Sequence, residues 1–365
     1  MLKSYLEVNL KNVEDNIRKI KNEVGEKVTV APVIKADAYG LGAIKLKNLL
    51  ENQNIKIVVV ATIDEAIKLR KSGFNMEILL LNELLPYEAS KVVKYNLTVG
   101  LSDYNVAKKL NEEAIKSNKK INVHFEVDTG MGRVGIKPEN ALDFMNKISK
   151  LKNLNTQGIY THFSSADSSK EYTKMQIDLF NKTIENLKKN GYEFKYIHSS
   201  ASSGILNFKN AYFNMVRPGI ITYGYMPDKN MENTLKLEPS TKLISHIVFI
   251  KEVPEGTAIS YGRTYVTKEK RMIATIPLGY ADGIKRVLSN KGKVFINGKY
   301  APIVGNVCMD NFMVDITGID ANVGDKVVIW DNRNLTIEEI ADICNTINYE
   351  ILCSISKRVK RKYIG

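Results

Sequence analysis

The stretch VTVAPVIKADAYGLGA (residues 28–43) joins an apolar, β-branched run to a glycine-containing turn, and Lys35 stands where the run ends. A run of this length and composition predicts a buried strand, and the residues after the turn have the spacing of an amphipathic helix. Seven further runs of the same kind follow, at 55–63, 76–82, 97–102, 121–129, 158–165, 195–202 and 213–220.

Helix-like amphipathic stretches lie between these runs, among them AIKLKNLLENQ and YNVAKKLNEEAIK. Eight strands that alternate with helices are what a parallel (β/α)8 barrel requires, and an open doubly wound sheet is the alternative. No G-x-G-x-x-G motif follows a strand, so the usual dinucleotide-binding signal of an open sheet is missing. We therefore predict an α/β chain that begins with a (β/α)8 TIM-like barrel.

The pattern changes at about residue 240, where short strand-like runs such as LISHIVFIKEV, RMIATIPLG and KVVIWD alternate with Gly, Asn and Asp turns. A polar stretch, MPDKNMENTLKLEPST (226–241), lies at the change. The sequence therefore predicts a barrel over residues 1–232 and a C-terminal, mostly β domain over 233–365.

The composition is that of a globular protein, with 365 residues of which 44% are hydrophobic and 25% charged. Three cysteines form neither a disulfide framework nor a zinc pattern, so we expect no metal site. The N-terminus has no apolar segment of signal-peptide length, and the apolar runs are too short to cross a bilayer. A cytoplasmic chain without a membrane partner is the expectation.

The net charge of +13 could indicate a nucleic-acid partner. The basic residues, however, are mostly lysines interleaved with Glu and Asp, and the one dense run, KRVKRK (357–362), contains no aromatic residue. We expect a solvated surface and a basic C-terminal tail, and no nucleic-acid partner, with DNA binding by the tail as the alternative.

Chemistry in (β/α)8 barrels takes place at the C-terminal ends of the strands. The polar residues at the predicted ends are Lys35, Asp128, Arg133, His162, His198 and Arg217. A buried lysine has a lowered pKa and can form a Schiff base with a carbonyl compound. The small residues Ser202, Gly219 and Ile220 would let backbone N–H groups approach an anion. An aldehyde that carries a phosphate, pyridoxal 5'-phosphate, would unite these two features.

Eight motifs resemble, in order and spacing, those of bacterial alanine racemases: IKADAYGLGA, VDTGMGRVG, GIYTHFSSAD, HSSAS, VRPGI, ISYGRTY, PLGYADG and IVGNVCMDNFMVD. The resemblance covers essentially the whole chain. It implies a barrel that binds pyridoxal phosphate, a C-terminal β domain, and a homodimer whose active sites combine residues of both subunits. The implied activity interconverts L-alanine and D-alanine and supplies D-alanine for peptidoglycan.

The resemblance also implies the roles of individual residues. Lys35 matches the lysine that carries the cofactor and acts as the base on D-alanine, and Tyr261 matches the base on L-alanine, which reaches the site from the partner subunit. Arg217 matches the arginine at the pyridine nitrogen, and with a protonated His162 it is expected to favour a tyrosinate at Tyr261. The implied cofactor contacts are Lys35, Tyr39, Arg133, His162, His198, Ser202, Arg217, Gly219 and Ile220. The implied contacts of the substrate carboxylate are Arg133 and Met309, and the implied residues of the site entrance are Asp167, Tyr280, Arg286, Asp310 and Lys357.

Two positions depart from the family pattern. Glu126 stands where many members have a lysine, in several of them carbamylated, and we expect its carboxylate to pair with Arg133 without carbon dioxide chemistry. Lys357 stands where many members have a tyrosine, which leaves the strictness of alanine specificity open.

Three alternatives therefore stay open: a racemase of the same fold with serine or broader specificity, a decarboxylase of the same barrel type, and a pyridoxal-phosphate-binding regulatory protein on a lone barrel. Decarboxylases of that type lack the pairing of the SYG tyrosine with VCMD, and the regulatory protein would lack the β domain and Tyr261.

Overall fold

The computed structural model describes residues 2–365, and the chain divides into two compact units. One, the barrel unit, comprises Glu14–Ala38 and Ala43–Leu237. The other, the β unit, comprises the N-terminal segment up to Val13, Tyr39–Gly42 and Glu238–Gly365. Each unit is described by itself.

The barrel unit contains eight parallel strands in the order β2-β9-β8-β7-β6-β5-β4-β3. The two ends of this order meet, because Val33 bridges Val59 and the backbone N–H of Ile34 donates to the Val59 carbonyl at 2.8 Å. The strands are β2 (Thr29–Val30), β3 (Ile57–Val60), β4 (Glu77–Leu80), β5 (Thr98–Leu101), β6 (Ile121–Glu126), β7 (Leu154–Tyr160), β8 (Tyr196–His198) and β9 (Met215–Val216). Seven predicted runs contain one of these strands, and the run at 158–165 overlaps only the end of β7, so the predicted barrel is confirmed although β7 begins earlier than expected.

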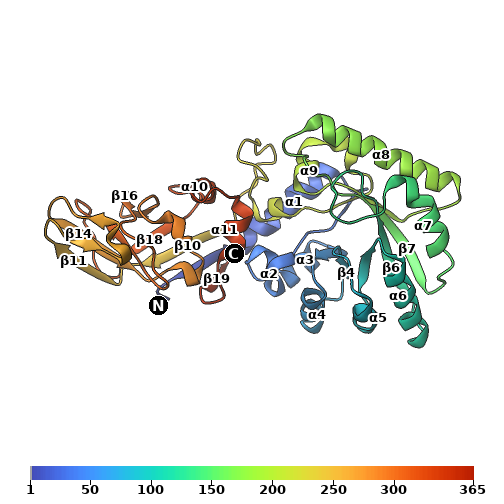
Figure 1. The fold of residues 1–365 in the computed structure, drawn as a ribbon, viewed down its shortest axis with the longest axis horizontal. Coiled ribbons are helices and arrows are strands. Elements are labelled where there is room, and N and C mark those ends of the chain that lie inside the picture. The colour runs from blue at the N-terminus through green and yellow to red at the C-terminus, as the bar shows by residue number, and fades with distance from the viewer. Residues whose placement is uncertain (1) are drawn as a thin grey trace. The chain divides into compact units, whose positions relative to one another are not determined.

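Helices follow the strands, and Figure 1 shows α4 to α8 on the outer side of β4, β6 and β7. Side-chain caps begin several of them: Thr62 accepts from the Glu65 N–H, Asp103 from the Val106 N–H, and Ser169 from the Tyr172 N–H. Apart from the short left-handed segment α2 (Lys35–Tyr39), the helices up to residue 207 are α1 (Leu10–Val24), α3 (Lys47–Asn52), α4 (Ile63–Lys71), α5 (Ala89–Tyr95), α6 (Tyr104–Lys116), α7 (Ala141–Ile148), α8 (Lys170–Lys189) and α9 (Ser202–Asn207). Among residues 2–365, no helix has the length and apolar character needed to cross a membrane.

The β unit is built on a six-stranded sheet in the order β16-β15-β18-β10-β1-β19, with a three-stranded sheet β11-β14-β17 and the hairpin β12-β13. The strands are β1 (Tyr5–Asn9), β10 (Thr241–His246), β11 (Phe249–Val253), β12 (Ala258–Ile259), β13 (Tyr265–Val266), β14 (Arg271–Ile276), β15 (Lys293–Ile296), β16 (Lys299–Pro302), β17 (Phe312–Asp315), β18 (Lys326–Trp330) and β19 (Lys360–Ile364). Two helices, α10 (Ile337–Ile343) and α11 (Asn348–Ser354), complete the unit. The predicted mostly β character is confirmed.

The basic run at the C-terminus is not a tail, and that expectation is wrong. Its second half is strand β19, which pairs in parallel with β1. Arg361 is turned inward and donates to four backbone carbonyls, those of Gly40, Ile355, Ser356 and Val359, at 2.6–2.9 Å. A guanidinium has donors only, so several carbonyls of a loop can share it.

Candidate active site

The turn after Lys35 is left-handed. Segment α2 (Lys35–Tyr39) contains Ala36, Asp37, Ala38 and Tyr39 with φ of 50, 54, 58 and 55°. Each residue other than glycine pays roughly 1–2 kcal/mol for this conformation, so surrounding contacts must hold the turn in place.

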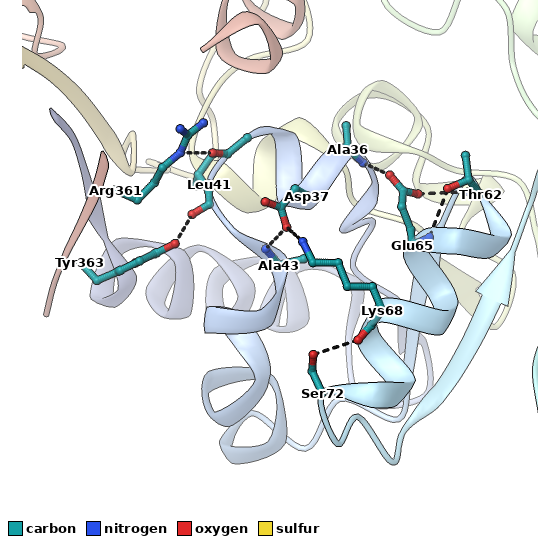
Figure 2. A network of polar contacts seen from close by, with 11 residues as sticks. Ala36, Asp37, Leu41, Ala43, Thr62, Glu65, Lys68, Ser72, Arg361 and Tyr363 are labelled. Carbon is teal, nitrogen blue, oxygen red and sulfur yellow. Dashed lines mark hydrogen bonds and ion pairs between the residues drawn. The ribbon is translucent and has the colours of Figure 1, made fainter. Parts of the chain in front are cut away.

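In the barrel unit, two carboxylates hold the turn (Figure 2). Glu65 accepts from the Ala36 N–H at 2.6 Å with one oxygen, and from the Ala61 and Thr62 N–H groups at 3.0 and 3.1 Å with the other. Asp37 accepts from the Ala43 N–H at 3.1 Å. The residue next to Lys35 is thereby fixed to the first turn of α4.

In the β unit, strand β19 holds the continuation of the same turn (Figure 2). Arg361 donates to the Gly40 carbonyl at 2.9 Å, and the Tyr363 hydroxyl donates to the Leu41 carbonyl at 2.8 Å. Gly40 has φ +87°, and a Cβ there would lie 2.9 Å from the Leu352 carbonyl oxygen, so this position requires glycine. Tyr39 is buried, and burial raises the pKa of its hydroxyl.

A row of polar residues crosses three strands inside the barrel. Glu126 on β6 is in register with Tyr160 on β7, and Tyr160 is in register with His198 on β8. The Tyr160 hydroxyl donates to the Glu126 carboxylate at 2.6 Å, and the Tyr160 ring stacks on His198 with centroids 4.9 Å apart. Burial and the adjacent carboxylate raise the pKa of Tyr160 well above its ordinary value, so this phenol stays a donor.

Arg217 follows β9 and is the cation at the centre of this interior, with an exposed fraction of 1%. It donates to the carbonyls of Thr161 and Ser199, both at 3.0 Å, to His162 Nδ1 at 3.3 Å, and to His198 Nδ1. Burial lowers the pKa of Arg217 to about 10, which leaves it charged at neutral pH. A guanidinium held by four acceptors has a defined orientation.

His162, at the end of β7, is neutral, so the expectation of a protonated His162 is wrong. Burial and the positive charges of Arg217, Arg133 and Lys35 lower its pKa to about 3. Because Arg217 donates to Nδ1, the ring hydrogen of the neutral imidazole is on Nε2. His162 is therefore a donor at Nε2. Arg217 contacts this imidazole directly, and the positive charges of Lys35 and Arg133 also act on it.

Arg133 stands at the end of a glycine loop that Asp128 shapes. Asp128 Oδ1 accepts from the N–H groups of Gly130 and Gly132 at 3.1 and 2.9 Å. The Tyr172 hydroxyl of α8 donates to the Gly130 carbonyl at 2.9 Å. The loop leaves the Arg133 side chain exposed, and Lys35 is exposed as well.

The ion pair expected between Glu126 and Arg133 is not formed among residues 2–365. Glu126 is buried and bonded to Tyr160, whereas Arg133 is exposed and affects Glu126 through its charge alone. Burial raises the pKa of Glu126, and the Tyr160 hydrogen bond, Arg217 and Arg133 partly oppose that rise. The shorter glutamate arm stays inside the barrel.

The residues expected to bind phosphate lie after β8 and β9. Ser202 opens α9 and Ile220 opens η5 (Ile220–Tyr223), and neither helix has a side-chain cap at its N-terminus. The Gly219 N–H donates to Ser202 Oγ at 3.0 Å, which joins the two helix starts. The barrel thus brings together uncapped N–H groups from two segments.

The β unit gathers a second set of predicted residues on three loops. Asn306 donates to the Tyr261 carbonyl at 2.7 Å, Cys308 accepts from the Tyr280 N–H at 3.0 Å, and the Met309 carbonyl accepts from the Ala281 N–H at 3.0 Å. The side chains of this set are exposed in the single chain, with fractions of 74% for Tyr261, 52% for Met309 and 45% for Tyr280. Large apolar side chains exposed together indicate a surface that another molecule covers.

Asp310 is paired with a residue that the sequence did not single out. Arg358 contacts Asp310 at 2.7 Å and Asp282 at 3.3 Å, and Asp282 also accepts from the Gly279 N–H at 2.9 Å. The remaining residues expected at the entrance, Asp167 in the barrel unit and Arg286 and Lys357 in the β unit, are exposed.

Sequence reasoning also missed Glu65, His124 and Gln157. Glu65 was recognisable only as a capping residue of α4. His124 and Gln157 lie within β6 and β7, where an interior polar side chain gives no motif. The one available signal was Gly158, a glycine inside a strand, which often marks a close approach of another group.

Two family models match the chain: the alanine racemase N-terminal domain over residues 8–227 and the alanine racemase C-terminal domain over residues 240–363. An alanine racemase of Halothermothrix orenii is 42% identical over 365 residues, covering 99% of this chain and 96% of that protein. An alanine racemase of Carboxydothermus hydrogenoformans is 41% identical and covers 99% of both chains.

Solved structures agree with these matches. The alanine racemase of Clostridium difficile 630 superposes with a TM-score of 0.95 at 38% identity, covering 100% of this chain and 96% of that one. The alanine racemase of Bartonella henselae with covalently bound pyridoxal phosphate gives a TM-score of 0.91 at 29% identity and covers 100% of both chains. The chain therefore belongs to the alanine racemase family and is an amino-acid racemase.

Proposed function

We propose that the chain is a pyridoxal-phosphate-dependent alanine racemase that interconverts L-alanine and D-alanine with two bases, Lys35 and Tyr261. The observation that carries the proposal is the contact of Arg217 with His162 at one end of the barrel, where the positive charges of Lys35 and Arg133 also act. A phosphorylated, anionic cofactor and a carboxylate substrate are the ligands that such a set would take.

The residues present fit pyridoxal phosphate. Two uncapped helix starts, joined by the Gly219–Ser202 hydrogen bond, offer N–H groups to a phosphate. Lys35 supplies the amine, and the donor-only Arg217 would keep a pyridine nitrogen unprotonated. When bound, the cofactor supplies an electron sink that acidifies the α-hydrogen of an amino acid.

Racemisation needs a base on each face of the α-carbon. We assign one face to Lys35 Nζ and the other to the Tyr261 hydroxyl. The Nε2 hydrogen of His162 is available to donate to an anionic oxygen such as that of Tyr261. Arg133, exposed on its glycine loop, is free to reach a substrate carboxylate, and Arg217 keeps its orientation through its buried acceptors.

A homodimer with shared active sites belongs to the same proposal. Its support is the exposed set Tyr261, Tyr280 and Met309, which a partner subunit would cover. We also propose that the product D-alanine is used for peptidoglycan.

Borohydride reduction of the purified protein followed by peptide mapping tests the cofactor assignment. The pyridoxyl mass is expected on the peptide that contains Lys35, and label on another lysine would refute the assignment. Steady-state kinetics with both enantiomers of alanine and of serine test the substrate. Turnover of serine above that of alanine would favour the alternative of altered specificity.

A further inference from the structure

A hydrogen-bonded series of buried polar side chains extends from Arg217 into the barrel wall. Arg217 donates to His198 Nδ1, His198 Nε2 lies 2.8 Å from His124 Nδ1, and His124 Nε2 lies 3.4 Å from Gln157 Oε1. Both imidazoles have an exposed fraction of 0%, and Gln157 has 8%. None of the roles described above uses His124 or Gln157.

The hydrogen bonds of this series can run in only one direction. Arg217 has only donors, so His198 Nδ1 must accept and the His198 hydrogen must be on Nε2. His124 Nδ1 then accepts this hydrogen, and the His124 hydrogen on Nε2 is directed at the Gln157 carbonyl oxygen. Every hydrogen bond of the series is thus donated in the direction away from Arg217.

A glycine on the neighbouring strand leaves the space that the His124 ring of this series occupies. A Cβ on Gly158 would lie 2.7 Å from His124 Nδ1, so only glycine at that position on β7 accommodates the imidazole on β6. Burial, together with the charges of Arg217 and Lys195, lowers the pKa of His124 to about 4, and burial with Arg217 and His124 lowers that of His198 well below its ordinary value. Both rings are therefore neutral, as the single direction of these hydrogen bonds requires.

We propose that His124 is a positioning residue, which accepts the Nε2 hydrogen of His198 and so holds the His198 Nδ1 lone pair against Arg217, with Gln157 accepting in turn from His124. The role of Arg217 toward the cofactor is taken from the proposed function. The tautomers and hydrogen bonds of the series do not depend on that role.

Solid-state 15N NMR of the holoenzyme labelled with 15N-histidine reads this arrangement directly, because the chain has only four histidines. His124 and His198 are expected as Nε2–H tautomers at neutral pH. His246 is expected as the opposite tautomer, because its Nδ1 lies 2.9 Å from the Lys3 carbonyl. An Nδ1–H tautomer or a doubly protonated ring at His124 or His198 would overturn the proposal, whatever the enzymatic activity.

Two variants of similar size separate positioning from packing. His124→Asn keeps an acceptor near the position of Nδ1, whereas His124→Leu offers none. The leucine variant should release the His198 Nε2–H to exchange with solvent about tenfold faster and lower kcat about tenfold with a smaller change in KM, because a misplaced Arg217 affects turnover most. The asparagine variant should stay within about threefold of wild type in both measurements.

Equal effects of asparagine and leucine would mean that His124 only fills space, and the proposal would be wrong. Should the leucine variant not fold, Gln157→Leu replaces it. This variant leaves the His124 Nε2–H without its acceptor, and faster exchange of that hydrogen is expected. Unchanged exchange would equally contradict the proposal.

Discussion

The residues around Arg217 in the barrel unit and the set around Tyr261 in the β unit are presented in opposite ways. In the barrel, Arg217 and His198 are buried and each contact is fixed by a hydrogen bond. In the β unit, loop backbones are hydrogen bonded, but Tyr261 and Met309 extend from them with 74% and 52% exposure. A buried charge must be paired within its own chain, whereas exposed apolar side chains gain from a second molecule. Under the proposed function, the buried groups around Arg217 are held within one chain, whereas the exposed set of the β unit needs a second chain to cover it.

The largest expected effect comes from joining one residue of each unit. Lys35→Ala and Tyr261→Ala should each lower turnover by about 10³-fold or more, because each removes a base. Mixed subunits should recover about a quarter of wild-type activity, because half the dimers are mixed and one of their two sites keeps both bases. A coupled assay of D-alanine oxidation after verified subunit exchange measures this. No recovery would place both bases of a site in one chain.

The second effect is a loss of stability in acid that originates in the barrel. His124, His162 and His198 have lowered pKa values, about 4 for His124 and about 3 for His162. Unfolded histidines take up protons near pH 6.5, so the stability these groups contribute is complete above 6.5 and decreases toward pH 4. Each should lower the free energy of unfolding by about 1.4 kcal/mol per pH unit below 6.5.

Urea unfolding at several pH values between 7 and 5 measures this slope, and His124→Asn should reduce it by the share of one histidine. A free energy of unfolding that does not change between pH 6.5 and 5 would contradict neutral buried histidines.

A smaller effect concerns the left-handed turn. Glu65→Gln removes a carboxylate that accepts three N–H groups, including that of Ala36. Glu339→Gln is the matched control, because Glu339 also closes a capping box, with Thr336, but holds no additional turn. We expect Glu65→Gln to cost about 1 kcal/mol more, since charge-assisted hydrogen bonds exceed neutral ones. Hydrogen exchange of the peptide over residues 34–40 should be about fivefold faster; equal behaviour of both variants would refute this role.

The smallest effect is expected at Glu126. Because Gln can also accept from the Tyr160 hydroxyl, Glu126→Gln should change kcat and KM only a few-fold. Burial raises the pKa of Glu126, so its ionised form destabilises the fold, and the variant should be more stable than wild type at pH 8 but not at pH 4.

Added bicarbonate should leave the activity of the wild type unchanged, whereas Glu126→Lys should be weak without carbon dioxide and partly rescued by it. A large loss of activity in Glu126→Gln would restore the idea that this carboxylate orients Arg133.

The sequence predicted the barrel because its strands are buried on both faces. Such strands appear in the sequence as nearly continuous apolar runs. It did not show that β1 pairs with β10 and β19, because a strand of alternating pattern does not specify its neighbours. Nor did it show that part of KRVKRK forms a strand. In the sequence, Arg361, which is turned inward, cannot be distinguished from the charged residues around it.

For the site, the sequence by itself determined which residues are present and in what order, and motifs such as IKADAYGLGA and VRPGI were enough to indicate the family. Only the tertiary structure decided their states. His162 is neutral because burial, and then positive charges from distant segments, lower its pKa, and Glu126 bonds Tyr160 because neighbouring strands place them in register. His124 and Gln157 acquired a direction only from Arg217. Protonation and hydrogen-bond direction depend on distance and burial in space, which residue order does not contain.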